Sequence, residues 1–166
     1  GSASLDLWLL DVTREQLRYH EAMRGRREAS ELDRQAEAGV EEDEKKMRQL
    51  VCDKFDQCLL QIGADVEAFR LWSSYLEFIS KWPDTTTEEQ QEKNDKLRRV
   101  FQNAVVQPVS LVDSLWKRYA AFEMKLARDE GTQDFLATPY GTQLSAKHKA
   151  ALELAMQRRS VWEKVQ

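Results

Sequence analysis

One aromatic motif occurs twice in this sequence, and its repetition constrains the fold more than any other feature. Both copies read L-W-x-x-Y-x-x-F; one begins at Leu71 and the other at Leu115, and their tryptophans lie 44 residues apart. Residues three and four positions apart share one face of an α-helix, so each copy predicts a helix with an aromatic stripe. A single helix pair cannot bury such a stripe, so the period predicts stacked helical repeats that share one core.

A weaker copy of the motif begins at Leu7 and Trp8. Asp11 stands where the other copies have tyrosine, and the distance from Trp8 to Trp72 is 64 residues rather than 44. Residues 24–44 contain few apolar side chains and account for the surplus length. We expect this insertion to be either a mobile loop or a solvated helical extension, because its composition does not decide between them.

Each aromatic helix is followed by a second stretch with helical periodicity. Its apolar residues recur at steps of three and four, which predicts one buried face. The three stretches contain, in turn, Met47, Leu50, Val51, Phe55, Cys58, Leu59 and Ile62; Leu97, Val100, Phe101, Ala104 and Val105; and Ala151, Leu154, Ala155, Val161, Trp162 and Val165. We assign Trp162 to the second helix of the third repeat, since Val165 stands where a fourth motif would have tyrosine.

Helix boundaries are predicted from proline and capping residues. Pro83 is followed by Thr85, Thr86, Glu88 and Glu89, which could form two overlapping capping boxes. A second break lies at Pro108, and Ser110 with Asp113 is expected to begin the next helix in the same way. The third is the segment 128–143, where Gly131, Pro139 and Gly141 predict a long irregular loop.

These signals predict an all-α fold, an α-solenoid of antiparallel helix pairs that form a right-handed superhelix of about three repeats. We expect one domain over residues 1–166, with repeats at about 5–63, 66–108 and 110–166. The opening Gly-Ser pair is typical of an expression vector, so we expect the chain to be a fragment of a longer protein.

Charge and hydropathy narrow the classes of function. The net charge is −4 and the pI is near 5.4, whereas nucleic-acid binding usually requires a basic face. No apolar run approaches the roughly 18 residues of a membrane span, and no signal peptide opens the chain. Cys52 and Cys58 lie in a core stripe without metal-ligand spacing, which favours reduced thiols of an intracellular protein. We therefore expect neither membrane nor direct nucleic-acid binding.

Catalytic constellations are not found in the sequence. His20 and His148 lie 128 residues apart, and neither follows a glutamate at the spacing that di-iron or zinc helices require. No glycine-rich phosphate loop occurs, and the acidic run 41–44 is typical of a solvated helix face. The sequence thus predicts no enzyme activity, no catalytic residues, no metal and no cofactor.

The paired motif is similar to the HAT (half-a-TPR) repeat, which occurs mainly in RNA-processing scaffolds. The residues that match its first helix are Trp8 in the weak copy, Trp72, Tyr75 and Phe78 in the second, and Trp116, Tyr119 and Phe122 in the third. Those that match its second helix are Phe55, and then Arg98, Phe101, Ala104 and Pro108. The resemblance implies that these residues form a structural core, and it leaves the partner-binding residues unknown.

Within the HAT class, residues 97–123 (LRRVFQNAVVQPVSLVDSLWKRYAAFE) resemble the large HAT subunit of cleavage stimulation factor. The resemblance implies a non-catalytic scaffold in nuclear pre-mRNA 3′-end cleavage and polyadenylation. The partners it implies are other cleavage and polyadenylation factor subunits: the WD-repeat and RRM subunits of the same factor, and the polyadenylation specificity factor. It also implies homodimerisation through later HAT repeats that lie outside this chain.

Two other functions stay open. A HAT-repeat scaffold of splicing or ribosome assembly would carry the same aromatic stripes. A generic helical-repeat adaptor is the second alternative, although the regular 34-residue TPR period is missing. We expect the isolated chain to be a monomer or to self-associate weakly through exposed Val161, Trp162 and Val165.

Overall fold

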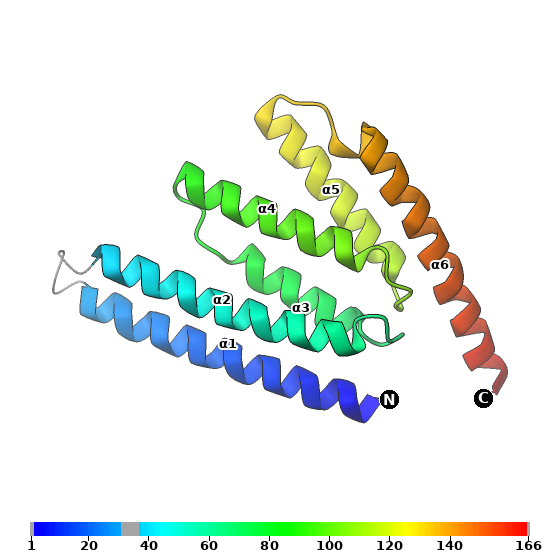
Figure 1. Cartoon of the computed structure of the whole chain (residues 1–166), viewed down its shortest axis with the longest axis horizontal. Helices are drawn as coiled ribbons and strands as arrows, with labels where there is room; N and C mark the ends of the chain where they lie inside the picture. Colours follow the sequence, from blue (N-terminus) through cyan, green and yellow to red (C-terminus); the bar gives the residue numbers. More distant parts are fainter. Residues whose placement is uncertain (1, 31–36, 166) are drawn as a thin grey trace. The chain divides into compact units, whose positions relative to one another are not determined.

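The computed structural model describes the backbone of residues 2–30 and 37–165, and the side chains of residues 4–26 and 39–161. All regular structure in these residues is helical, so the predicted all-α class is confirmed (Figure 1). The elements are α1 (Ser2–Ser30), α2 (Glu37–Ile62), α3 (Phe69–Ser80), α4 (Thr87–Ala104), α5 (Val112–Glu130), a single 3-10 turn η2 (Phe135–Ala137) and α6 (Pro139–Val165). They form two compact units, Gly1–Gln61 and Ile62–Gln166.

The first unit is a pair of antiparallel helices, α1 and α2 (Figure 1). Two ion pairs record the antiparallel register. Near one end of the pair, the Arg26 guanidinium lies 2.9 Å from the Asp43 carboxylate. About fifteen residues earlier along α1, the Asp11 carboxylate accepts a hydrogen bond from Lys54 Nζ at 2.5 Å. The hydrogen bond from Lys54 to Asp11 raises the pKa of the lysine. Asp11, which replaces the motif tyrosine, therefore contributes an ion pair instead of an aromatic contact.

The segment 24–44 is helical wherever the structure describes it. Residues 24–30 complete α1 and residues 37–44 begin α2, and the Arg26–Asp43 pair links the two extensions. Of the two alternatives left open by the sequence, the described part takes the helical extension, while residues 31–36 lie outside the described residues. Among the described side chains of this segment, 24–26 and 39–44, most are exposed, which agrees with its polar composition.

The second unit packs α3, α4, α5 and α6 in chain order, each against the next (Figure 1). Its core is apolar and spans all four helices: Leu71, Trp72, Tyr75, Leu76 and Ile79; Val100, Phe101 and Ala104; Leu115 and Tyr119; Leu144 and Ala151. Each helix contributes one stripe at helical spacing, so the burial follows the periodicity of the sequence. At the end of α6, Val161 is exposed, and the side chains of Trp162 and Val165 lie outside the described residues.

Capping explains where α4 begins and why the expectation for α5 was wrong. Thr86 caps α4: its hydroxyl accepts from the Glu89 amide, and the Glu89 carboxylate accepts from the Thr86 amide. One of the two predicted capping boxes is thus confirmed. Ser110 does not cap α5: Leu111 takes the N-cap position in a left-handed conformation, and no side-chain cap is formed. The Ser110 amide instead donates to Val66 O at 2.7 Å.

The predicted loop over 128–143 is wrong at both ends. α5 continues to Glu130 and ends at Gly131, whose φ of 65° suits a left-handed helix cap. α6 already begins at Pro139, a position where proline has no amide to lose. Gly141 lies inside α6, where a Cβ atom would come within 2.5 Å of the Leu136 backbone. The glycines and the proline therefore mark helix ends and one close contact, and only residues 131–138 connect the helices.

Candidate functional site

A buried polar cluster joins α4 to α5. Glu123 of α5 is 1% exposed, and its two carboxylate oxygens accept from Arg98 Nε at 2.8 Å and Nη2 at 2.6 Å. The Tyr119 hydroxyl donates to the same carboxylate at 2.7 Å, and Gln102 Nε2 donates to that hydroxyl at 3.1 Å. A buried carboxylate is tolerated only when its charge is paired and its oxygens are hydrogen-bonded. We name these four residues the Arg98 cluster.

The Arg98 cluster shifts the proton affinity of two of its members. The hydrogen bond to Glu123 raises the pKa of Arg98. Burial raises the pKa of Tyr119, so its hydroxyl stays a hydrogen-bond donor at neutral pH. The Arg98 guanidinium also lies over the Phe135 ring of η2, 4.7 Å from its centroid. The arrangement holds α4, α5 and η2 together.

The motif residues of the third repeat form one aromatic group with α4. The Phe101 ring lies 5.5 Å from Tyr119 and 5.6 Å from Phe122, between ring centroids. The Trp116 indole stacks on the His148 ring of α6 at 4.6 Å and an interplanar angle of 8°. His148 Nδ1 lies 2.9 Å from Val105 O, and burial lowers the pKa of its imidazole. His148 therefore connects α6 to both α5 and the end of α4.

The motif residues of α3 are also buried. Trp72 is 5% exposed, and its indole Nε1 donates to Gly63 O at 2.9 Å. Tyr75 and Phe78 are buried on the same stripe. Ala104 is fully buried, and Pro108 lies half-buried in the connection after α4. In the first unit, Phe55 is fully buried and Trp8 is half-buried, with Lys54 Nζ 6.0 Å from the Trp8 ring centroid.

Sequence reasoning missed Glu123 and His148 as members of this core. Glu123 follows Tyr119 by four residues and thus shares its helix face, so a single acid on an otherwise buried stripe was the available signal. His148 carried no comparable signal, because its partners Trp116 and Val105 are more than thirty residues away in the sequence. Only the packing of α6 shows that this imidazole is buried.

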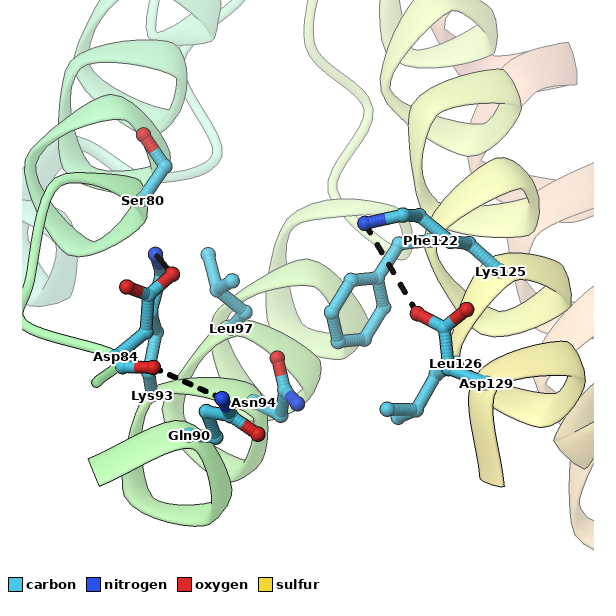
Figure 2. A pocket seen from close by; sticks show the side chains of 10 residues that line it. All are labelled: Ser80, Asp84, Gln90, Lys93, Asn94, Leu97, Phe122, Lys125, Leu126 and Asp129. Carbon is cyan, nitrogen blue, oxygen red and sulfur yellow. Dashed lines mark hydrogen bonds and ion pairs between the residues drawn. The ribbon is translucent and has the colours of Figure 1, made fainter. Parts of the chain in front are cut away.

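The first surface groove runs between α4 and α5 near the start of α4 (Figure 2). Its volume is about 390 Å³. Polar side chains of α4 and the preceding turn form one wall, α5 forms the other, and Leu97 and Phe122 lie between them. Both lysines are near carboxylates: Lys93 lies 3.1 Å from Asp84 and Lys125 lies 4.0 Å from Asp129. This groove, the edge groove, thus carries no net charge that would select an ionic ligand.

The second groove is larger, about 1080 Å³, and lies between two interhelical loops and α6. The loops are residues 63–68 before α3 and 105–111 before α5, and the Ser110–Val66 hydrogen bond joins them. Leu152, Met156 and Arg158 of α6 line the opposite wall. We call this the loop groove. It contains exposed apolar side chains next to charged ones, as protein-binding surfaces commonly do.

Metal-ligating side chains do not gather in the described part of the chain. Among those residues, no three histidine, cysteine or acidic side chains are placed to hold a metal ion. Burial raises the pKa of the Cys58 thiol to about 11, which suppresses the nucleophilic thiolate at neutral pH. Over the same residues, none of the helices has the length and apolar character needed to cross a membrane.

Comparison with known proteins gives a consistent result. Residues 34–161 match the family model described as Suppressor of forked protein (Suf). The mRNA 3′-end-processing protein rna-14 of Neurospora crassa is 35% identical over 103 residues, which cover 60% of this chain and 9% of that protein. The corresponding protein of Yarrowia lipolytica is 39% identical over 72 residues, covering 43% of this chain and 9% of that protein.

A third relative, the mRNA 3′-end-processing protein rna14 of Schizosaccharomyces pombe, is 32% identical over 81 residues, covering 49% of this chain and 11% of that protein. The chain therefore spans about a tenth of the length of the curated relatives it matches. The family match covers more than half of the chain and includes both complete aromatic motifs. As the resemblance predicted, the chain belongs to the Suppressor of forked family of HAT-repeat proteins, whose fold is a helical-repeat solenoid.

Proposed function

We propose that this chain is a non-catalytic protein-interaction scaffold of the nuclear pre-mRNA 3′-end cleavage and polyadenylation machinery. The observation that carries the proposal is its membership of the Suf family, together with relatives that are named mRNA 3′-end-processing proteins. Because the chain covers about a tenth of those relatives, the proposal concerns the contribution of this segment to a larger assembly.

The distribution of side chains supports a scaffold. The aromatic motif residues of α3, together with Tyr119 and Glu123 of α5, are buried, where they stabilise the packing of helices. The edge groove and the loop groove are on the surface and are lined by side chains from several helices and the loops between them. Surfaces of stacked helical repeats are commonly used to bind proteins. The partners that we propose are other subunits of the cleavage and polyadenylation machinery.

Direct RNA binding by this segment is disfavoured by its charge. The net charge is −4, and phosphate binding draws most of its affinity from clustered lysine and arginine. We propose that RNA is held by partner subunits, and that homodimerisation uses later repeats outside this chain. The isolated chain should then be a monomer, or a weakly self-associating species, in sedimentation velocity.

Affinity purification of the full-length protein, followed by mass spectrometry, tests the proposal. We expect polyadenylation and cleavage factors to be enriched over a purification with an unrelated helical-repeat bait. Enrichment of spliceosomal or ribosome-assembly proteins instead would support the alternative HAT scaffold. Depletion of the protein should also lengthen transcripts beyond their normal cleavage sites; unchanged 3′ ends would contradict the proposal.

A further inference from the structure

The loop groove is bounded by a strained residue, Leu111. It has φ 61° and ψ 24°, and among the described residues it is the one residue other than glycine with a positive φ. Glycine adopts this left-handed conformation without steric cost, whereas leucine does not. Leu111 is the N-cap residue of α5, and its carbonyl accepts the amides of Ser114 and Leu115. A glycine would adopt this left-handed conformation with less strain, so the leucine side chain needs a separate explanation.

Burial does not supply that explanation. The Leu111 side chain is 53% exposed at the edge of the groove, and two other groove residues, Val66 and Met156, are 38% and 62% exposed. Three aliphatic side chains from two loops and a helix thus border one cavity and face solvent. Strained residues in native proteins concentrate at functional sites, and exposed apolar groups at the edge of a groove are typical of protein-binding surfaces.

Arg158 provides a fixed positive charge in the same groove. Its Nη1 atom donates to Ala64 O at 2.9 Å and to Pro108 O at 3.4 Å, so the guanidinium is anchored to both loops. A guanidinium has five N–H donors. Among the described residues, these two carbonyls are the hydrogen-bond partners of Arg158, and no carboxylate lies within ion-pair distance. The remaining N–H groups can therefore donate to a carboxylate of another molecule in the bidentate geometry that arginine favours.

The other charges of the groove distinguish a protein ligand from RNA. Asp65 and Glu67 of the first loop and Asp113 at the start of α5 line one side, while Arg158 and Arg159 line the α6 side. Because the three carboxylates outnumber the two guanidinium groups, the groove would repel a phosphate backbone. A peptide has no such restriction, because it can place one carboxylate on the α6 side and neutral atoms toward the loops. The Asp65 carboxylate already accepts a hydrogen bond from the Glu67 amide at 3.0 Å.

We propose that the loop groove binds a short segment of a partner protein, which packs an aliphatic or aromatic side chain against Leu111 and Met156 and pairs a carboxylate with Arg158. The proposal rests on the proposed function only in taking the partner to be a protein. It defines a motif, an acidic residue near an apolar one, and it does not require a particular subunit of the processing machinery.

Phage-displayed random peptides of about twelve residues, selected on the intact chain, are the probe. We expect the enriched peptides to contain an acidic residue close to an aliphatic or aromatic one. Fluorescence anisotropy with one such peptide should show at least about tenfold weaker binding to Arg158→Glu, because attraction becomes repulsion. The same peptide with its acid replaced by lysine should bind Arg158→Glu better than it binds the wild-type chain. A conformational defect cannot produce this exchange of preference.

Leu111→Gly separates binding from folding. The substitution relieves the left-handed strain and removes the side chain, so we expect an unchanged or higher melting temperature together with about tenfold weaker peptide binding. Arg99→Glu, on the exposed side of α4, and Leu60→Ala, on the exposed side of α2, are the matched controls and should bind as wild type.

Three results would overturn the proposal: no acidic-apolar motif among the enriched peptides, wild-type affinity of Arg158→Glu and Leu111→Gly, or displacement of the peptide by a ten-residue oligouridine RNA, which would make the groove a nucleic-acid site. Its failure is distinguishable from failure of the proposed function. If Arg158→Glu and Leu111→Gly bind the selected peptide as the wild type does, while the full-length wild type recovers the 3′-end-processing factors, the loop-groove proposal fails and the scaffold proposal stands. If the wild type recovers none of these factors but the peptide motif is found and depends on Arg158, the scaffold proposal fails and the loop-groove proposal stands.

Discussion

Arg98 and Glu123 form a two-point ion pair between α4 and α5, with Nη2 2.6 Å from one carboxylate oxygen and Nε 2.8 Å from the other. The carboxylate is buried, while the arginine side chain remains 32% exposed. The pair therefore extends from the interior of the second unit to its surface. A charge in this position can be kept only while its partner is present.

Removal of the arginine should destabilise the second unit strongly. In Arg98→Ala, the buried Glu123 carboxylate keeps only the Tyr119 hydroxyl as a partner, and we expect a loss of roughly 2–4 kcal/mol in the free energy of unfolding. Arg98→Lys should recover only part of this loss, because lysine cannot make both bonds in the same geometry. Urea unfolding followed by circular dichroism measures the free energy of unfolding of both variants. Midpoints equal to that of the wild type would show that the ion pair makes no net contribution to stability.

His148 should make stability depend on pH in a defined direction. Burial lowers its pKa below the ordinary 6.5, so between the two values the unfolded chain binds the proton more readily than the folded chain. Stability is therefore highest above about pH 6.5 and falls as the pH drops toward the folded pKa, because protonation of the buried ring is penalised. The hydrogen bond with the Val105 backbone and the charge of Asp113 both favour the protonated form and partly offset this effect.

The melting temperature between pH 7.5 and pH 5 is the measurement, with each variant compared with its own value at high pH. His148→Gln should show a shallower decline than the wild type, because the titrating group is gone. His20→Gln, at an exposed position of α1, is the control and should retain the wild-type decline. A decline of equal slope in all three proteins would assign the pH dependence to other groups.

The two motif tryptophans of the second unit should differ in their effect on stability. Trp72 is buried and hydrogen-bonded to Gly63, so Trp72→Ala should cost about 3–5 kcal/mol and unfold or severely destabilise the chain. Trp116 is only half-buried and stacks on His148, so Trp116→Ala should cost less. The melting temperatures of the two variants, measured by calorimetry, test this difference. A change of a degree or two in Trp72→Ala would contradict a core role for this residue.

Replacement of glycine by alanine should change stability in opposite directions at Gly141 and Gly25. A Cβ atom at Gly141 would lie 2.5 Å from Leu136 Cα, a backbone contact that cannot be relieved by a rotamer change, so Gly141→Ala should be destabilising. Gly25, inside α1, has open space around a Cβ, and Gly25→Ala should stabilise by about 0.5–1 kcal/mol because alanine favours helix. Unfolding midpoints of the two variants should shift in opposite directions; equal signs would contradict the close approach of η2 to α6.

Much of the secondary structure could be predicted because it depends on local chemistry. Periodicity located all three aromatic helices and their partners, and the Thr86–Glu89 box marked the start of α4. The connections were harder to predict. Pro139 and Gly141 were interpreted as loop residues, although one begins α6 and the other is needed for close packing inside it. The sequence does not show which neighbour a glycine will meet.

The surface grooves could not be predicted at all. Val66, Leu111 and Arg158 are separated by more than forty residues from one to the next, and the loop groove exists because α6 returns to the loops before α3 and α5. Leu111 carries no sequence signal for a left-handed conformation. It adopts this conformation directly after Ser110, whose amide donates to Val66 O in the other loop.

By itself, the sequence determined the fold class, the family and the helix faces that are buried, because helical periodicity and a repeated aromatic motif depend on residues close together in the chain. The tertiary structure alone decided which buried polar groups find partners, as Glu123 and His148 do, and where charged and apolar side chains meet on the surface. These contacts join residues 25 to 94 positions apart, and their distances and angles are set only when the helices pack.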